Sequence, residues 1–175
     1  MSTSTAEHRA AAADRRARCV VLTVSDTRTP TTDTAGRLLR EQLVAAGHEI
    51  LDHAIVKDEP AEIDRCLRGW LHGDPLPGLI LTTGGTGIAR RDTTIEIVDS
   101  LLHKPLPGFG ELFRQLSFTQ IGPAAMLSRA TAGLATGTHG ACFVFALPGS
   151  PHAAELALTK LILPELPHLL AERDR

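Results

Sequence analysis

The amino-acid sequence predicts an α/β protein with a mostly parallel sheet. Apolar runs of strand length alternate with segments of helical spacing, and three such strand and helix pairs follow one another in the first part of the chain. The strands are nearly continuous in apolar character, which is typical of strands covered by helices on both faces. A chain of 175 residues is long enough for one well-formed core, so we expect a single domain over residues 18–175.

The first three pairs have clear boundaries. We expect strands at 19–24, 50–56 and from 79 onward, and helices at 34–46, 60–72 and 92–102. Asp33 is a candidate N-cap and Gly47 a candidate C-terminal stop for the first helix. Pro60 suits the first turn of the second helix.

The second half is less regular. We expect an irregular segment at 103–108, a helix at 109–121, a short helix or a strand within 126–134, a strand at 141–147 and a helix at 152–170. Gly122 and Pro123 end the first of these helices, and Pro164 and Pro167 disturb the last one.

Composition excludes several classes of function. Hydrophobic residues make up 43% of the chain, charged residues 22%, and the formal net charge is −2. Aromatic residues are only 3% and tyrosine is absent, so neither a stacking surface nor a basic tract favours a nucleic-acid partner. No apolar run approaches the roughly 20 residues of a membrane span. We therefore expect a cytoplasmic protein, with residues 1–17 as a disordered N-terminal extension that lacks the apolar region of a secretory signal.

Polar loops follow the predicted strands at one edge of the sheet. They comprise residues 25–33, Asp58, 82–92 and 148–151. In an open parallel sheet, such loops open on the same edge, where ligands bind. The loop after the third strand is rich in glycine and threonine, so its backbone N–H groups can turn inward and cradle an anion or a polar ring. Asp92 follows this loop, where it could cap a helix or hold a metal.

Standard nucleotide, zinc and hydrolase motifs are absent. No P-loop occurs, and the dinucleotide-binding pattern fails because Arg90 takes the place of its third glycine. Cys19, Cys66 and Cys142 are not spaced as zinc ligands and are better interpreted as buried reduced thiols, and no nucleophile elbow is present.

Carboxylates and cations remain as candidates. The acidic set is Asp26, Asp33, Asp58 and Asp92. Carboxylates beside a phosphate-binding backbone are typical of Mg²⁺-nucleotide sites and are consistent with phosphoryl or nucleotidyl transfer. The alternative for the last three is helix capping, because each lies at a helix start.

Serines and arginines near these loops have two interpretations as well. Ser25 and Ser150 could equally be turn residues. Arg90, Arg91 and Arg129 could receive phosphate or face solvent.

Several short segments over about residues 19–165 form a recognisable set. They are 23–27, 33–36, 81–87, 91–94 with Glu96, 107–114, 126–129 and 147–151. Thr-Gly-Gly-Thr-Gly at 83–87 and Leu-Pro-Gly-Ser-Pro at 147–151 are the most specific of these. In these segments and in their order, the chain resembles the MoaB/Mog family of molybdenum cofactor biosynthesis, and its MoaB branch in particular.

The resemblance implies a three-layer α/β/α fold, a trimer or a dimer of trimers, and contacts with other molybdenum cofactor enzymes. It implies molybdopterin, a tricyclic pterin dithiolene with a terminal phosphate, as ligand. In active members Mg²⁺-ATP adenylylates that phosphate and releases pyrophosphate.

Residue roles follow from the resemblance by position. Asp58 and Asp92 would be the catalytic carboxylates, with Asp58 as the Mg²⁺ ligand. Ser25, Asp26 and Asp33 would line the nucleotide and phosphate region. The residues expected to hold molybdopterin are Thr82, Gly84, Gly85, Thr86, Gly87, Ser128, Pro148, Gly149, Ser150 and Pro151.

Two other functions stay open at this stage. One is a pterin-binding protein without turnover, because fold alone does not determine function. The other is a nucleotide-recycling or nucleotide-hydrolysing relative of the same fold, which the absence of an additional domain disfavours.

Overall fold

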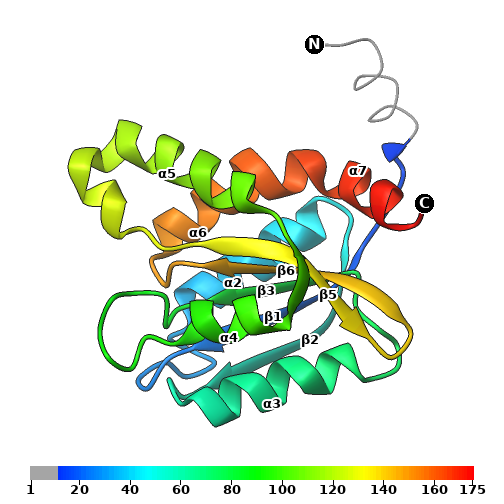
Figure 1. The fold of residues 1–175 in the computed structure, drawn as a ribbon, viewed down its shortest axis with the longest axis horizontal. Coiled ribbons are helices and arrows are strands. Elements are labelled where there is room, and N and C mark those ends of the chain that lie inside the picture. The colour runs from blue at the N-terminus through cyan, green and yellow to red at the C-terminus, as the bar shows by residue number, and fades with distance from the viewer. Residues whose placement is uncertain (1–11) are drawn as a thin grey trace.

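The computed structural model describes residues 12–175 and shows a six-stranded sheet with helices on both faces (Figure 1). The strands are β1 (Arg18–Val24), β2 (Glu49–Val56), β3 (Leu79–Thr83), β4 (Leu102–Pro105), β5 (Thr131–Gly137) and β6 (Gly140–Leu147). The α-helices are α2 (Thr34–Ala45), α3 (Pro60–Leu71), α4 (Thr94–Leu101), α5 (Pro107–Ile121), α6 (Pro151–Ala157) and α7 (Leu163–Arg173). A 3₁₀ segment, η1 (Gly122–Leu127), follows α5, and a π-helical segment, η2 (Leu158–Ile162), joins α6 to α7.

The sheet has the order β2-β1-β3-β6-β5-β4. The first four strands in this order are parallel, whereas β5 runs antiparallel to β6 and β4 antiparallel to β5. The predicted parallel sheet is confirmed, with two antiparallel strands added at one edge.

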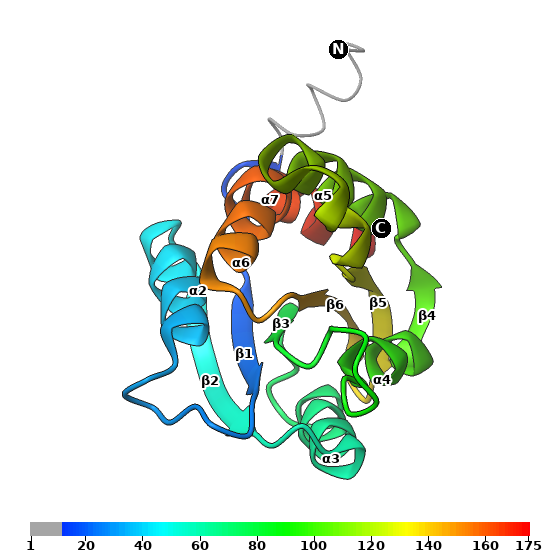
Figure 2. The ribbon, with the colours of Figure 1, turned by 90° about the vertical axis from the view of Figure 1, so that its left-hand side faces the viewer.

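Helices form a layer on each face of the sheet (Figure 2). One core cluster lies under α2, α5, α6 and α7, and the other under α3 and α4. Strand β1 contributes to both, since Val21 packs into the first cluster while Val20 and Leu22 pack into the second. This alternation follows from the two-residue period of a strand and gives the three-layer α/β/α fold.

Local sequence signals place the helix ends as predicted. The Asp33 carboxylate accepts a hydrogen bond from the Gly36 N–H and caps α2. Gly47 follows the end of α2 with φ of 84°, a conformation that favours glycine. Pro60 is the first residue of α3, where its missing N–H costs no helical hydrogen bond.

Strand β4 covers 102–105, where we predicted the end of a helix at 102 and an irregular segment over 103–108. Its register pairs Leu102 with Ala135 and Pro105 with Gly133. Proline is tolerated there because β4 is an edge strand. Gly133 permits the close approach, since a Cβ atom on it would lie 2.6 Å from the Lys104 carbonyl oxygen. The strand signal was missed because it depends on this long-range pairing.

Other boundaries also differ from the prediction. The ambiguous stretch 126–134 divides between the end of η1 and the start of β5. Helix α4 begins at Thr94 and not at Asp92, and Thr93 occupies its N-cap position. The last helical stretch runs from Pro151 to Arg173.

The N-terminal extension lies largely outside the described residues, which begin at Ala12. Within the described part, Ala12 and Ala17 are buried, and Arg15 forms an ion pair with Asp174 on the segment after α7. The packed part of the chain therefore starts before β1. Over residues 12–175, no helix combines the length and the apolar character needed to cross a membrane.

Candidate functional site

The loops that follow β1, β2, β3 and β6 meet at one edge of the sheet, as predicted. The Gly84 N–H donates to the Leu147 carbonyl oxygen at 3.2 Å. Gly84 has φ of 96°, and a Cβ atom on it would lie 2.2 Å from the Val24 carbonyl oxygen. A Cβ atom on Gly149 would lie 3.1 Å from the Gly84 Cα. Glycine therefore lets the carboxyl ends of β1, β3 and β6 approach closely.

Two cavities open at this edge and share Gly84 and Gly149 in their walls. The larger rim cavity has a volume of about 460 Å³ and is bounded by the glycine loop, α5, η1 and the start of α6. The smaller rim cavity, of about 250 Å³, lies over the loop between β1 and α2. Their common wall means that two ligand groups could bind side by side.

Asp58 carries a buried oxygen without a hydrogen-bond partner. Its Oδ1 atom makes no hydrogen bond in the described part of the chain. A Cβ atom on Gly85 would lie 3.0 Å from this oxygen and 2.3 Å from Thr94 Oγ1, which is buried and without a partner as well. Burial raises the pKa of Asp58, and the negative charges of Asp92 and Asp26 raise it further, while Arg91 opposes them. An unpartnered carboxylate oxygen beside a glycine loop is suited to receive a cation.

Asp92 lies against the same glycine loop, at Gly87. Its Oδ2 atom accepts a hydrogen bond from the Ala89 N–H at 2.8 Å, and a Cβ atom on Gly87 would lie 2.5 Å from that oxygen. Thr93 occupies the N-cap position of α4, so the capping alternative for Asp92 is wrong. Asp92 also lines the larger rim cavity.

Arg91 ties three of the loops together. Its guanidinium lies 3.0 Å from Asp26 Oδ2 and 2.7 Å from Glu59 Oε1, and it donates to the Asp58 carbonyl oxygen at 3.3 Å. The Asp58 N–H in turn donates to Asp26 Oδ1 at 3.3 Å. Sequence reasoning left Arg91 undecided, and its partners lie 65 and 32 residues away along the chain.

Arg129 contacts the glycine loop at Gly87. It donates to the Gly87 carbonyl oxygen at 2.9 Å, forms an ion pair with Glu96 and lines the larger rim cavity. Slight burial alone would raise the pKa of Glu96, but the hydrogen bonds, first of all that from Arg129, lower it below the usual value. Arg129 therefore helps to fix the cavity wall.

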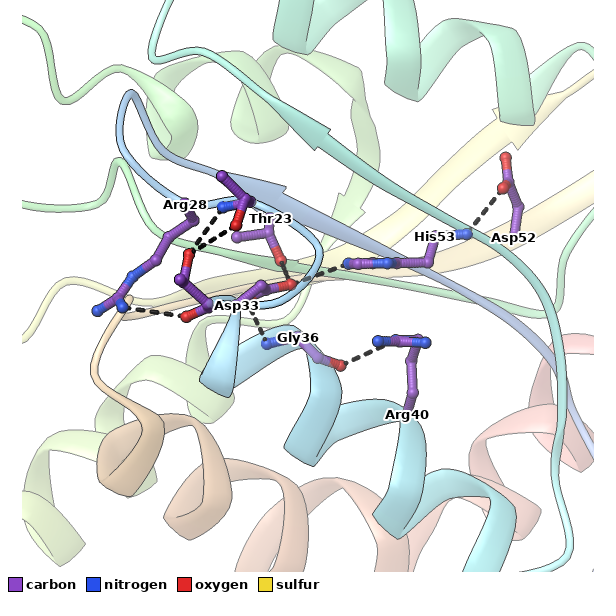
Figure 3. Close-up of polar contacts among 9 residues, drawn as sticks. Thr23, Arg28, Asp33, Gly36, Arg40, Asp52 and His53 are labelled. Carbon is purple, nitrogen blue, oxygen red and sulfur yellow. Dashed lines mark hydrogen bonds and ion pairs between the residues drawn. The ribbon is translucent and has the colours of Figure 1, made fainter.

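Asp33 is held by the protein itself (Figure 3). Its Oδ2 atom accepts a hydrogen bond from Thr23 Oγ1 at 2.8 Å and lies 3.0 Å from His53 Nε2, while Oδ1 caps α2. Burial, and then the nearby charge of Arg40, lowers the pKa of His53. Asp33 lines the smaller rim cavity, yet its carboxylate already has three partners, so its clearest role is to fix the loop after β1.

The two serines make turn and cap contacts. Ser25 Oγ accepts hydrogen bonds from the Thr27 and Arg28 N–H groups and lines the smaller rim cavity. Ser150 accepts from the Ala153 N–H and caps α6. Both positions thus serve the backbone and still face a cavity.

No group of three or more His, Cys, Asp or Glu side chains between residues 12 and 175 could hold a metal ion alone. Mg²⁺ in nucleotide sites needs only one or two carboxylates, because phosphate oxygens and water supply the remaining ligands. Asp58, with its unpartnered oxygen, fits that requirement.

The chain matches known proteins along nearly its whole length. A family model described as a probable molybdopterin binding domain matches residues 20–168. The chain belongs to the MoaB/Mog family. The molybdenum cofactor biosynthesis protein B of Bacillus subtilis is 50% identical over 171 residues, which are 97% of this chain and 96% of that protein.

Solved structures of the MoaB/Mog family superpose closely on this fold. A crystal structure of a molybdenum cofactor biosynthesis protein B gives a TM-score of 0.85 at 47% identity, covering 92% of this chain and 98% of that chain. The tungsten cofactor synthesizing protein MoaB of Pyrococcus furiosus gives 0.83 at 36% identity, covering 92% and 99%. The predicted family and fold are confirmed.

Most of the residues that we predicted to hold molybdopterin line the larger rim cavity. They are Gly84, Gly85, Thr86, Gly87, Ser128, Pro148, Gly149 and Ser150. Thr82 lies buried within β3, and Pro151 begins α6, and neither lines this cavity. Asp26 and Asp58 lie outside both rim cavities, behind the glycine loop and joined by the Asp58 N–H.

Proposed function

We propose that this protein acts in molybdenum cofactor biosynthesis by transferring the adenylyl group of ATP to the terminal phosphate of molybdopterin. The observation that carries this proposal is the unpartnered, buried Oδ1 atom of Asp58 beside Gly85, with Asp92 held on the same glycine loop. Membership of the MoaB/Mog family supports molybdopterin as the ligand.

The larger rim cavity suits a pterin. Its volume of about 460 Å³ is within the usual range for small-molecule sites. Ile121, Leu127 and Leu156 supply apolar wall surface for a flat ring system. The glycine loop and the residues before α6 supply backbone and hydroxyl groups for the polar edges of the ring.

The adenylyl transfer is balanced without a further reactant. An oxygen of the molybdopterin phosphate forms a bond to the α-phosphorus of ATP, and the bond from that phosphorus to the bridging oxygen breaks to leave pyrophosphate. The phosphate is already an anion, so the protein need not supply a strong base. Its task is to position two anions and to offset their repulsion.

The residues have separate tasks in this scheme. Asp58 would bind Mg²⁺, which offsets the negative charge that builds up on the leaving pyrophosphate. Asp92, fixed by the Ala89 N–H at the edge of the cavity, would act on the phosphates through the bound Mg²⁺, because a carboxylate repels a phosphate unless a cation lies between them. Arg91 keeps Asp26 and the Asp58 backbone in place.

Incubation of the pure protein with molybdopterin and Mg²⁺-ATP tests the proposal. We expect adenylylated molybdopterin and pyrophosphate from the wild type, and neither product from Asp58→Asn or Asp92→Asn. Asp64→Asn is the matched control, because Asp64 pairs with Arg68 on the exposed side of α3. No product from the wild type, where a known active relative works, would refute the transfer. With an active wild type, abolished transfer and retained pterin binding in Asp92→Asn would separate catalysis from binding.

A further inference from the structure

A third cavity, which shares no residue with the two rim cavities, lies at the opposite end of the strands. It has a volume of about 520 Å³ and surrounds the starts of strands, with Arg18 at the start of β1, Gly78 just before β3 and Gly140 at the start of β6. None of its lining residues lines either rim cavity. We call it the basic pocket.

The charges of the basic pocket are unbalanced. Four arginines line it, Arg15, Arg16, Arg18 and Arg173, against two aspartates, Asp74 and Asp174. This leaves an excess of two positive charges in a chain whose formal net charge is −2. Such a local excess attracts anions over distances of about a Debye length.

The ion pairs within the basic pocket do not neutralise all of its positive charge. Asp174 is shared between Arg15 and Arg173, and both arginines lower its pKa. Within residues 12–175, the Arg16 guanidinium donates only to backbone carbonyl oxygens, those of Ala13 and Arg15, at 2.9 and 3.1 Å.

Arg18 is the least engaged of the four arginines. Arg18 is exposed, and its guanidinium has no hydrogen-bond or ion-pair partner among residues 12–175. By contrast, the Nε–H of Arg68, on the surface of α3, donates to both carboxylate oxygens of Asp64 at 2.9 Å. Arg16 and Arg18 therefore offer guanidinium donors that lack a carboxylate.

We propose that the basic pocket binds a small phosphate monoester with an apolar body. A phosphate monoester carries a charge of about −1.5 to −2 at neutral pH, which matches the excess in the pocket. Guanidinium groups bind phosphate with two parallel hydrogen bonds. Leu76, Pro77 and Leu170 in the wall supply surface for the apolar part. The binding is independent of the proposed adenylyl transfer, because the two sites share no residue.

Titration of the full-length, nitrogen-15-labelled protein with phenyl phosphate at low ionic strength tests this inference. We expect saturable shifts of the Gly78 and Gly140 amide signals in the millimolar range or below. Arg18→Gln should weaken binding about tenfold or more, through loss of a charge-assisted contact. Arg68→Gln, a change of equal charge at a paired surface position, should leave the affinity unchanged.

Comparison ligands make the test specific. Benzoate has a similar apolar body but a single carboxylate charge, so it should bind at least several times more weakly than phenyl phosphate. Equal binding of the two would overturn the assignment to phosphate. Shifts confined to Gly84–Gly87, or an unchanged affinity in Arg18→Gln, would overturn the site itself. An Arg18→Gln spectrum that otherwise matches the wild type shows that the fold is intact.

Discussion

Replacement of Arg91 by glutamine separates the positioning of the site from the stability of the fold. Arg91 joins Asp26, Glu59 and the Asp58 carbonyl oxygen, so its loss frees the loops after β1 and β2. It is also the positive charge that opposes the raised pKa of Asp58. We therefore expect a small effect on folding and a large one on the site.

The expected loss of stability follows from exposure. The side chains of Arg91, Asp26 and Glu59 are 56%, 41% and 53% exposed, and exposed ion pairs contribute about 0–1 kcal/mol each. The free energy of unfolding should fall by about 1 kcal/mol, which lowers Tm by about 2–4 °C for a chain of this size. Adenylyl transfer should fall by at least about tenfold, because misplacement of reacting groups is costly.

The pH profile of transfer distinguishes positioning from a purely structural role. Asp58 must be ionised to bind Mg²⁺, and because its pKa is raised, we expect the acid limb of activity at higher pH than an unperturbed aspartate would give. Removal of the Arg91 charge raises that pKa further, so the acid limb of Arg91→Gln should move to higher pH. Arg68→Gln serves as the control and should leave the limb in place. A limb that stays unchanged or moves to lower pH in Arg91→Gln would refute the reasoning.

Three further substitutions test the packing around the site by urea unfolding. Gly85→Ala should lower the free energy of unfolding by about 1–3 kcal/mol, because φ is 62° and the new Cβ atom would lie 2.3 Å from Thr94 Oγ1. Gly108→Ala is the control and should not lower it, because nothing lies within 4 Å of the new Cβ atom. Equal losses in the two variants would contradict the steric argument. Asp33→Ala should cost about 2–4 kcal/mol, since it removes the α2 cap and the contacts with Thr23 Oγ1 and His53 Nε2. A loss below about 0.5 kcal/mol would argue against a structural role. Phe113→Ala should lower the free energy of unfolding by about 3–5 kcal/mol, because the Phe113 side chain is fully buried. A loss below about 1 kcal/mol would show that the core closes over the cavity that the substitution leaves.

The sequence was sufficient to predict the features that depend on local chemistry. Apolar runs located β1, β3 and β6, and the order of strands and helices placed their carboxyl-end loops at one edge. The Asp33 cap and the stop at Gly47 followed from side-chain and backbone preferences. The glycines of the loop after β3 were expected to let the backbone turn, and Gly84 and Gly85 have positive φ of 96° and 62°. The close approach of neighbouring backbone that Gly84 permits was not predicted.

Features that depend on distant partners were not predictable in this way. Strand β4 exists because Gly133 admits the neighbouring backbone, and its own four residues carry little strand signal. Arg91 could be seen as a charge but not as a link between loops, since its partners come from two other parts of the sheet edge. For the same reason, the sequence could not show that Asp33 is fully engaged while an oxygen of Asp58 is not.

A crystal structure of the protein with ATP and Mg²⁺ is the most direct test of the proposed site. We predict Mg²⁺ at about 2.0–2.1 Å from Asp58 Oδ1, with further ligands from the phosphates and water. The triphosphate should lie along the glycine loop beside Asp92. A nucleotide bound elsewhere, with Asp58 Oδ1 still lacking a partner, would contradict the assignment of Asp58 and with it the proposed transfer.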